Sequence, residues 1–323
     1  MPHPSWYPDR FVERLPFLRR RARLTIAVRA FFDQRGYLEV ETPYVVRAPG
    51  EEVHVAAFAT ERVGGDGVRE ALWLHTSPEF AMKRLLVAGS GPIFQLARVW
   101  RNGEGSDRHA AEFTMLEWYR PDATLDDLMD ETEALLRAVL PPDVAPFERL
   151  RMAEAFRRHA DADLLGTLGD AAALAASCGM ERRDGEGWED LFFRILLARI
   201  EPAIGHDRPC FLTHWPAAQA ALARRDPADP RVALRFELFA GGMELANAFV
   251  ELTDAPEQRA RFVADRARRH ALYGGPDWPL DEDFLAALAH GMPAAGGVAL
   301  GFDRLAMLAS GATHIDQVLW LPL

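Results

Sequence analysis

The segment from Ile93 to Tyr119 reads IFQLARVWRNGEGSDRHAAEFTMLEWY, and the fold is built around it. Its ends, residues 93–101 and 112–119, carry the apolar and aromatic side chains of strands, and a polar linker joins them. We therefore expect a hairpin in which Arg101 ends one strand and Phe113 lies on the next. An arginine can donate two hydrogen bonds to a phosphate, and an aromatic ring offers a stacking face. The spacing alone equally fits an exposed hairpin with solvated charges.

Strand patterns lie toward both ends of the chain, whereas helical patterns fill its middle. Besides the hairpin, strands are expected at residues 37–41, 71–75, 232–239, 244–252 and 297–301. Helices are expected at residues 17–35, 125–140, 254–273, 281–290 and 302–309. Because strands and helices do not alternate as βαβ units, the pattern predicts an α+β fold with a central antiparallel sheet flanked by helices.

Two of these helices carry signals for their buried face or their start. In the helix at residues 17–35, apolar residues in steps of four (Leu18, Ala22, Ile26 and Ala30), widened by Leu24, Val28 and Phe32, form a stripe that is predicted to be buried. Thr124, followed three residues later by Asp127, resembles a capping box in which Asp replaces the usual Glu. We therefore expect the next helix to begin directly after Thr124.

The composition is that of an ordinary globular chain with an acidic balance. Among 323 residues, 37 are basic and 48 acidic, which gives a formal net charge of -11. Proteins that grip long stretches of nucleic acid need a basic face, so this balance argues against that class. Two cysteines, Cys178 and Cys210, cannot form a disulfide framework. The chain has neither a signal-peptide core nor an apolar run long enough for a membrane span, so we expect a cytoplasmic protein.

A second polar stretch, ELANAFVE at residues 244–251, places two glutamates seven residues apart. On a regular strand this odd spacing puts Glu244 and Glu251 on opposite faces, so they meet one ion only across a turn or bulge. Carboxylate oxygens suit Mg²⁺, which usually keeps waters and bridges to substrate phosphates. Two solvated acids are the plain alternative.

A third stretch, GGVALGFDR at residues 296–304, combines glycines with an arginine at an expected helix start. Glycine lets a backbone approach a ligand closely. Such a turn from strand to helix is common, so Arg304 alone is a weak signal. The chain has no Walker-type phosphate loop and no GxGxxG, so a nucleotide would have to bind in another way.

Taken together and in order, these segments resemble the signature motifs of class II aminoacyl-tRNA synthetases. Residues 36–43 resemble motif 1, residues 94–117 resemble motif 2, and residues 301–304 resemble motif 3. Residues 76–85 and 244–252 are similar to the lysyl-tRNA synthetase branch. The resemblance covers almost the whole chain, and it implies the class II catalytic fold.

We expect no counterpart of the anticodon-binding barrel of a lysyl-tRNA synthetase, because only about 16 residues precede the first expected helix. A catalytic core without that barrel resembles the EpmA family (also PoxA or GenX), and so does the run WYRP at residues 118–121. Members of that family attach a lysyl-type group, preferably (R)-β-lysine, to a lysine side chain of translation elongation factor P. The resemblance implies one class II catalytic domain over residues 1–323, with a mainly helical insertion at about 122–230 and no anticodon-binding domain.

The resemblance implies an ATP-dependent ligase that also uses Mg²⁺. The substrate carboxylate would attack the α-phosphate of ATP, and pyrophosphate would leave. A lysine amine of elongation factor P would then attack the aminoacyl-adenylate. The resemblance also implies a homodimer formed through motif 1, and it argues against tRNA or a membrane as partners. Two alternatives stay open: a truncated enzyme that charges tRNA, and a silent paralogue that only binds an amino acid or a partner.

Carried over by position, one set of residues would bind ATP and Mg²⁺. Arg101 would contact the α-phosphate and the substrate carboxylate, Phe113 would stack on adenine, and Arg304 would cover its other face. Arg101 and Arg304 are the catalytic candidates, and Glu244 and Glu251 would hold Mg²⁺. The implied ATP-binding residues are Arg101, Asn102, Gly103, Glu104, His109, Phe113, Glu244, Leu245, Gly301 and Arg304.

A second set would bind the amino acid. Glu79 would meet the ammonium nearer the carboxylate, while Tyr119 with Glu257 would meet the terminal ammonium, a set that suits a dication and not aspartate. Ala299 stands where lysyl-tRNA synthetases usually have glycine, and one methyl group can shift the preference between an α- and a β-amino acid by ~1–3 kcal/mol. The implied substrate-binding residues are Ser77, Pro78, Glu79, Tyr119, Glu251, Glu257 and Ala299.

Overall fold

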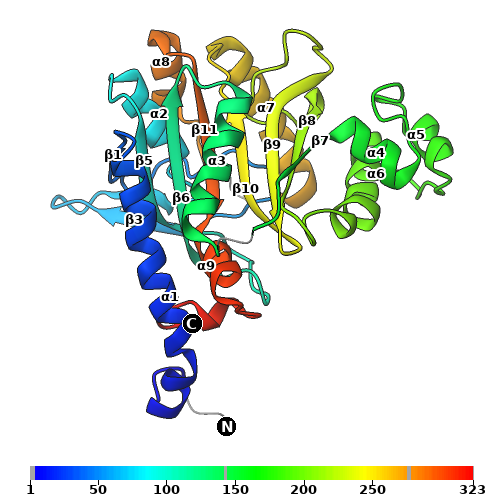
Figure 1. Cartoon of the computed structure of the whole chain (residues 1–323). Coiled ribbons are helices and arrows are strands. Elements are labelled where there is room, and N and C mark those ends of the chain that lie inside the picture. The colour runs from blue at the N-terminus through cyan, green and yellow to red at the C-terminus, as the bar shows by residue number, and fades with distance from the viewer. Residues whose placement is uncertain (1–3, 142–143, 275–277, 323) are drawn as a thin grey trace. The chain divides into compact units, whose positions relative to one another are not determined.

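The chain divides into two units (Figure 1). The computed structural model describes residues 4–141, 144–274 and 278–322. The first unit consists of residues 1–141 and 251–323, and the second consists of residues 142–250. The expected organisation as one domain with an insertion at about 122–230 stays a prediction.

The expected hairpin forms the middle of the sheet in the first unit. Val99 of its first strand lies opposite Phe113 of its second. The strand order is β1 (Leu38–Glu39), β5 (Ile93–Trp100), β6 (Glu112–Pro121) and β11 (Ala295–Gly301). β6 is antiparallel to both neighbours, while β1 runs parallel to β5. A separate antiparallel sheet has the order β2 (Val45–Val46), β4 (Arg69–Leu74) and β3 (Ala59–Val63).

Helices flank the larger sheet of the first unit (Figure 1). They include α1 (Pro8–Asp33), α2 (Glu79–Val87), α3 (Leu125–Val139), α7 (Ala255–Tyr273), α8 (Glu282–Gly291) and α9 (Phe302–Ser310). The helix α1 packs against α3 and α9, and α2 packs against α8 and β6. Thr124 and Asp127 form the predicted capping box at the start of α3, with hydrogen bonds of 2.9 and 3.2 Å.

Helix α1 differs from its prediction in its start and in part of its buried face. It begins at Pro8, which fits the first helical turn, rather than at residue 17. Leu24, Val28 and Phe32 are buried as predicted, but Ile26 of the series in steps of four is 70% exposed. Each step of four advances by about 40° around a helix with 3.6 residues per turn, and the series therefore leaves the core. The buried residues are Leu18, Arg21, Leu24, Val28, Phe31 and Phe32.

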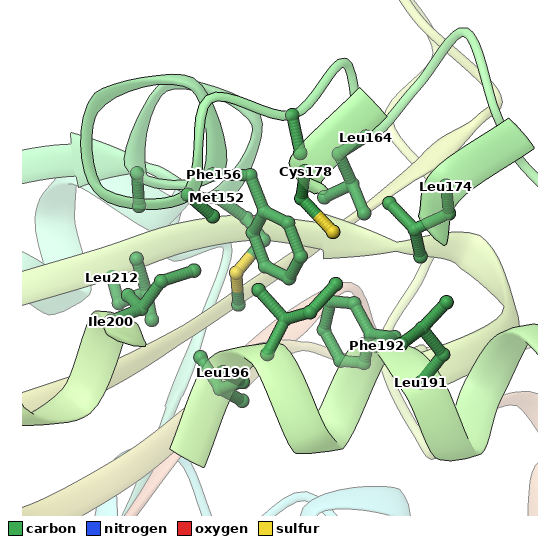
Figure 2. Close-up of a cluster of buried hydrophobic side chains, with 14 of the residues drawn as sticks. Met152, Phe156, Leu164, Leu174, Cys178, Leu191, Phe192, Leu196, Ile200 and Leu212 are labelled. Atoms are coloured by element: carbon green, nitrogen blue, oxygen red, sulfur yellow. The ribbon is translucent and has the colours of Figure 1, made fainter. Parts of the chain in front are cut away.

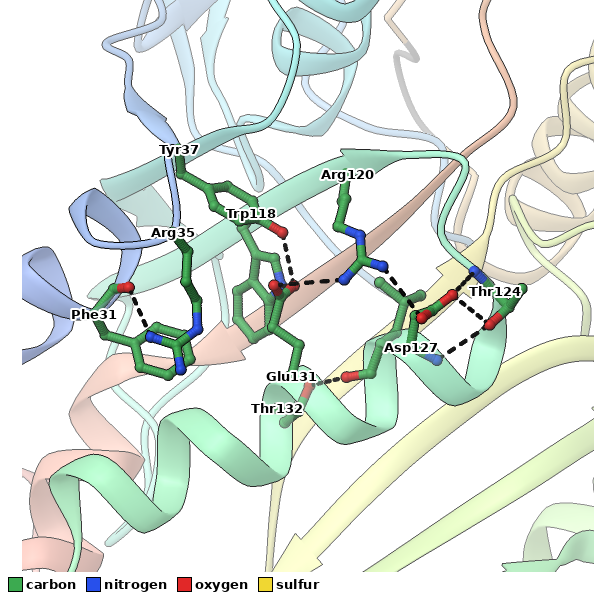
Figure 3. A network of polar contacts seen from close by, with 10 residues as sticks. Phe31, Arg35, Tyr37, Trp118, Arg120, Thr124, Asp127, Glu131 and Thr132 are labelled. Atoms are coloured by element: carbon green, nitrogen blue, oxygen red, sulfur yellow. Dashed lines mark hydrogen bonds and ion pairs between the residues drawn. The ribbon is translucent and has the colours of Figure 1, made fainter.

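A buried carboxylate on α3 joins this helix to the sheet (Figure 3). Glu131 accepts hydrogen bonds from the Tyr37 hydroxyl at 2.7 Å and from Trp118 Nε1 at 3.0 Å. Arg120 Nη1 lies 3.8 Å from the same carboxylate. Because Tyr37 precedes β1 and Trp118 lies on β6, the network fixes α3 across the strands that carry the candidate site.

The second unit combines a sheet with a cluster of helices. Its strand order is β10 (Met243–Val250), β9 (Val232–Ala240), β8 (Cys210–Pro216) and β7 (Glu148–Arg151). β7 runs parallel to β8, and the other pairs are antiparallel. The helices include α4 (Met152–Ala160), α5 (Ala171–Cys178) and α6 (Trp188–Ile195), which continues into a π-helix at Leu196–Ile200. Their apolar faces meet around Phe156 and Phe192, whose stacked ring centroids are 5.1 Å apart (Figure 2).

Strands β7 and β8 lie in a stretch that the sequence predicts to be mainly helical. β7 reads ERLR and is short and charged, while β8 reads CFLTHWP, an apolar run that periodicity does not distinguish from a helix. The antiparallel pairs of both units agree with an α+β fold, and each unit adds one parallel pair. No helix in the three described ranges has both the length and the apolar character needed to cross a bilayer.

Candidate active site

The first unit holds a buried ammonium group between the buried carboxylate of Glu251 and the largely buried one of Glu79. Lys83 on α2 is 2% exposed, and its Nζ lies 2.5 Å from Glu79 Oε1 and 2.6 Å from Glu251 Oε2. Glu79 begins α2, one helical turn before Lys83. Glu251 is fixed to the first residue of β11 through a hydrogen bond from its N–H to the carbonyl of Ala295 at 2.9 Å. The ammonium group of Lys83 therefore joins carboxylates from two segments that are far apart in the sequence.

A third buried carboxylate, Glu117 on β6, belongs to the same group. It accepts hydrogen bonds from Ser77 Oγ at 2.5 Å and from the Tyr119 hydroxyl at 3.0 Å. Ser77 Oγ also accepts a hydrogen bond from the N–H of Glu79 at 3.0 Å, and Pro78 is the N-cap residue of α2. Lys83 and Glu117 are the two members to which the sequence analysis assigned no role. The acidic cluster, as we name it, consists of Ser77, Glu79, Lys83, Glu117, Tyr119 and Glu251.

Burial changes the proton affinities in the acidic cluster. It raises the pKa of Glu117 to about 8, and the nearby charge of Glu79 adds to this shift. It raises the pKa of Glu251 to about 7, although Lys83 acts in the opposite direction. Burial alone would lower the pKa of Lys83, but the charges of Glu251 and Glu79 raise it above its usual value. Three carboxyl groups thus share one cation, and Glu117 and Glu251 bind protons more tightly than exposed glutamates do.

Gly297 lets β11 pass directly beside the acidic cluster. A Cβ atom at this position would lie 2.2 Å from Tyr119 Cε1 and 2.7 Å from Glu251 Oε1, so a larger residue does not fit without moving them. Oε1 of Glu251 is buried and has no hydrogen-bond partner within the described part of the chain. A cationic group of a ligand would satisfy this acceptor.

Two further residues predicted to bind substrate differ in their relation to the acidic cluster. Ala299 on β11 lies opposite Glu117, and its methyl group packs against a small apolar cluster that contains Met115. Glu257 on α7 instead pairs with Arg261 at 2.7 Å and is 38% exposed. The structure brings Ala299 next to the cluster and places Glu257 in a helix-surface ion pair, and the roles of both stay predictions.

Arg101 and Phe113 lie together where the hairpin strands meet their connecting loop. The guanidinium carbon of Arg101 is 5.3 Å from the centroid of the Phe113 ring. Arg101 Nε is buried without a hydrogen-bond partner in the described residues, and Nη1 lies 3.8 Å from Glu104 Oε1. An unused guanidinium donor beside a half-buried ring is an arrangement that can receive a phosphate and a base.

Arg304 at the start of α9 contacts the loop of the hairpin. Its Nη2 contacts His109 Nε2, and its Nε donates to the carbonyl of Arg108 at 3.4 Å. On its other side, the ring of His109 is fixed by Ser106 Oγ, which lies 2.7 Å from Nδ1. The structure therefore brings together two of the residues predicted to bind ATP.

The remaining candidates for ATP binding in the first unit border these side chains. Asn102 donates its N–H to the carbonyl of Ala56 at 2.7 Å, which anchors the start of the loop. Gly103 has a φ of 83°, a backbone conformation that glycine adopts without strain. Gly301 is the N-cap residue of α9 and so precedes Arg304 by one helical turn.

A buried ion pair supports the nucleotide side, as we name the group of Arg101, His109, Phe113 and Arg304. Arg21 on α1 contacts Asp303 through Nη1, and its Nη2 donates to Thr114 Oγ1 at 2.9 Å. Asp303 also accepts a hydrogen bond from the N–H of Thr114 at 2.6 Å. Because Thr114 follows Phe113 and Asp303 precedes Arg304, this contact sets the spacing between the ring and the guanidinium. The sequence analysis did not predict this ion pair. The available signal was Arg21, a charged residue on the apolar face of α1.

Glu244 and Leu245 lie on β10 of the second unit. A β-bulge directly after Glu244 shifts the alternation of faces by one residue, so the odd spacing to Glu251 no longer assigns the two glutamates to opposite faces. Burial, together with the charge of Glu244, raises the pKa of Glu237 to about 8, although Glu237 pairs with Arg235 at 2.6 Å. In the residues that the structure describes, no group of three or more His, Cys, Asp or Glu side chains is arranged to hold a metal ion.

Comparison with known protein families decides to which family the chain belongs. The family model of the tRNA synthetases class II (D, K and N) matches residues 12–323. The chain belongs to this family. Its membership confirms the class II synthetase fold expected from the motifs, and it implies that this synthetase-like enzyme uses ATP.

Curated relatives in this class II family match along nearly their whole length. A protein of Edwardsiella ictaluri is 47% identical over 322 residues, which are 98% of this chain and 96% of the relative. Proteins of Klebsiella pneumoniae and Erwinia tasmaniensis are 46% and 45% identical, with the same shares covered. All three relatives are named elongation factor P–(R)-β-lysine ligase.

Proposed function

We propose that this class II enzyme is a ligase that adenylates (R)-β-lysine, or lysine, with ATP and transfers it to a lysine side chain of translation elongation factor P. The names of the relatives support this activity, since the matches extend over 98% of the chain. The single observation that carries the proposal is the excess of buried carboxylates in the acidic cluster.

The charges of the acidic cluster suit a substrate with two ammonium groups. Glu79, Glu117 and Glu251 are three carboxylates against the one ammonium of Lys83. Two substrate ammonium groups would balance the remainder, and the raised pKa values of Glu117 and Glu251 would fall because a nearby cation favours the carboxylate. Aspartate would bring a further negative charge into a buried acidic site, which is costly.

The nucleotide side suits the formation of an adenylate. Phe113 would stack on adenine, and Arg101 would hold the α-phosphate while the substrate carboxylate attacks it and pyrophosphate leaves. Arg304 would stabilise the nucleotide from α9. In the second step the lysine amine of elongation factor P attacks the carbonyl carbon of the adenylate, and AMP leaves with the bonding electrons.

The methyl group of Ala299 supports a preference for the β-isomer. It lies opposite Glu117, beside the carboxylates that would hold the substrate amines. A methyl group at such a position can shift a substrate preference by ~1–3 kcal/mol. We therefore assign to Ala299 the choice between (R)-β-lysine and lysine.

We also propose that Glu244 and Glu251 hold Mg²⁺ when ATP is bound. Carboxylate oxygens are the donors that Mg²⁺ prefers. The charge of Glu244 contributes to the raised pKa of Glu237, a repulsion that a cation would relieve. Bound Mg²⁺ would neutralise charge on the phosphates.

A homodimer formed through motif 1 is part of the proposal. Leu38, Tyr44 and Val45 in and beside this segment are 57%, 39% and 46% exposed, and a second copy would cover such apolar side chains. Light scattering should give twice the chain mass, and a monomer mass would contradict the dimer. A cytoplasmic location and a role without tRNA complete the proposal.

Transfer to the protein substrate tests the proposed function. We expect elongation factor P to gain the mass of one lysyl group after incubation with the enzyme, ATP, Mg²⁺ and (R)-β-lysine, as measured by mass spectrometry. A variant of elongation factor P without its acceptor lysine serves as the control. Acylation of tRNA but not of elongation factor P would favour the truncated tRNA-charging enzyme instead.

A further inference from the structure

The backbone of a loop of the first unit, residues 48–55, accepts hydrogen bonds from two side chains that follow it in the sequence. Trp278, which is 5% exposed, donates its indole N–H to the carbonyl of Gly50 at 2.6 Å. Arg269 on α7 donates to the carbonyl of Glu52 at 3.1 Å, and its guanidinium carbon lies 3.9 Å from the centroid of the Trp278 ring. The backbone of Glu52 is thus fixed by contacts that leave its carboxylate uncommitted.

The Glu52 side chain folds back over Gly50 toward the start of α2. A Cβ atom on Gly50 would lie 2.5 Å from Glu52 Oε2 and 2.7 Å from Thr76 Oγ1, so both side chains border the same point. Thr76 directly precedes Ser77 of the acidic cluster. The charge of Glu52 contributes to the raised pKa of Glu79, which agrees with this placement.

Glu52 has no counter-ion of its own. In the described ranges the structure gives its carboxylate neither a hydrogen bond nor an ion pair, and the residue is half-buried. The ammonium of Lys83 is already engaged by Glu79 and Glu251. Oε1 of Glu251, which is 2% exposed as a residue, is a second acceptor of the same cluster without a partner. Two unpaired carboxylate oxygens beside one occupied cation call for positive charge from a ligand.

We propose that Glu52 is a specificity-determining residue, whose carboxylate contacts the substrate ammonium that Glu79 binds, so that the 48–55 loop forms one wall of that amine site. This inference rests on the proposed function and adds to it which part of the substrate is read. In a bound diamino acid, the amine that is nearer the carboxylate lies between Glu52 and Glu79. An amino acid without that amine gains no binding energy from Glu52.

Calorimetric titration of the Glu52→Gln variant tests the assignment. The side chain keeps its shape and loses its charge, so the Kd for lysine and for (R)-β-lysine should rise by about tenfold or more, as for a lost charge-assisted hydrogen bond. The KM for ATP should not change. Glu61→Gln on β3, which removes an equally acidic but exposed side chain paired with Arg69, is the matched control and should bind like the wild type.

Two singly charged analogues show which amine Glu52 reads. Norleucine retains only the amine next to the carboxylate, and its Kd should rise in Glu52→Gln. ε-Aminocaproate retains only the terminal amine, and both proteins should bind it equally. Loss of affinity for ε-aminocaproate alone, or no loss for any of these ligands, would overturn the assignment.

A second variant separates the position of the loop from its charge. Trp278→Phe removes the hydrogen bond to Gly50 but keeps Glu52, and it should weaken norleucine binding by about threefold, the size of a modest neutral hydrogen bond. Equal binding by this variant and the wild type would show that the loop needs no anchoring.

A wild-type protein that binds no diamino acid would overturn the proposed function itself, whereas normal wild-type binding with an unaffected Glu52→Gln variant would overturn only the role of Glu52.

Discussion

The acidic cluster and the nucleotide side lie along one strand but differ in burial and charge. Glu117 and Tyr119 of β6 are buried, whereas Phe113 on the same strand and Arg101 next to it are partly exposed. The cluster has its acceptors fixed by hydrogen bonds before any ligand arrives, because a buried charge is costly unless its partners are in place. The nucleotide side offers donors beside a loop, which suits a large, strongly hydrated polyanion.

Strand β6 fixes the distance between the acidic cluster and the nucleotide side. Phe113 and Glu117 lie on the same face of β6, four residues apart, so about 13 Å of strand separates them. A substrate with its adenine at Phe113 and an ammonium at Glu117 would place the reacting carboxylate and phosphate between them. The spacing of Phe113 and Glu117 along β6 therefore sets the length of the adenylate that can contact both residues.

The largest effect should come from removing the guanidinium on the nucleotide side. We expect Arg101→Ala to reduce ATP–pyrophosphate exchange by about 10²–10³-fold, because charge stabilisation in the transition state is lost. Lysine binding, measured by calorimetry, should weaken far less than the exchange, because Arg101 would contact only the carboxylate of the amino acid and neither of its ammonium groups. Arg98→Ala, which removes a 40% exposed arginine from the same strand, is the control. Equal loss of lysine affinity in Arg101→Ala would break the separation of the two regions.

Removing a carboxylate from the acidic cluster should give the converse result. Glu79→Gln should weaken lysine binding by about 100-fold, since a charge-assisted contact with a largely buried acceptor is lost, and leave the KM for ATP within about twofold. Glu257→Gln should change lysine affinity little, because Glu257 pairs with Arg261 on the surface of α7. A comparable loss in Glu257→Gln would instead bring that residue into the substrate site, as the sequence predicts.

Weakening the ion pair between Arg21 and Asp303 should have an effect of intermediate size, and only on ATP. Asp303→Asn weakens the contacts to Arg21 and Thr114. We expect the KM for ATP to rise by about tenfold, on the order of 1.4 kcal/mol, while lysine affinity stays the same. A parallel rise of both constants would mean that Asp303 supports the whole fold rather than the spacing of Phe113 and Arg304.

The smallest effect is a pH dependence of stability. Burial raises the folded-state pKa of Glu117 to about 8 and of Glu251 to about 7. A raised carboxyl pKa contributes stability at acid pH that is lost as the pH rises through the folded-state value, so the Tm without ligand should fall between about pH 5 and pH 8. Glu117→Gln should reduce this slope, and lysine should flatten it. An equal slope in the variant would contradict the titration of Glu117.

Local pattern was enough to predict the hairpin and its two chemical side chains. The alternation at residues 112–119 placed Phe113 correctly, and the polar linker placed Arg101 at the loop. The capping box of Thr124 also followed from the sequence, because its hydrogen bonds span only three residues. The buried face of α1 followed only in part. Leu24, Val28 and Phe32 are buried as predicted, whereas Ile26 is exposed although it is equally apolar, because only tertiary packing selects among such residues.

Long-range burial explains what the sequence could not give. Nothing local distinguishes Glu117 from a solvated strand residue, because Ser77, its partner, comes from a distant part of the chain. Burial raises the pKa of Glu237, and the charge of Glu244 across the β9–β10 pair adds to this shift. Lys83 looks like an exposed helix lysine until Glu251 is placed beside it. Each of these depends on contacts that form only in the folded chain.

The central claim is that the buried acidic cluster selects a diammonium substrate within a family named for D, K and N enzymes. The most direct measurement is ATP–pyrophosphate exchange with (R)-β-lysine, lysine, aspartate and asparagine, each supplied separately to the wild-type protein. We predict exchange with the two lysines and none above background with aspartate or asparagine. Exchange supported by aspartate or asparagine, or by no diamino acid, would contradict the account.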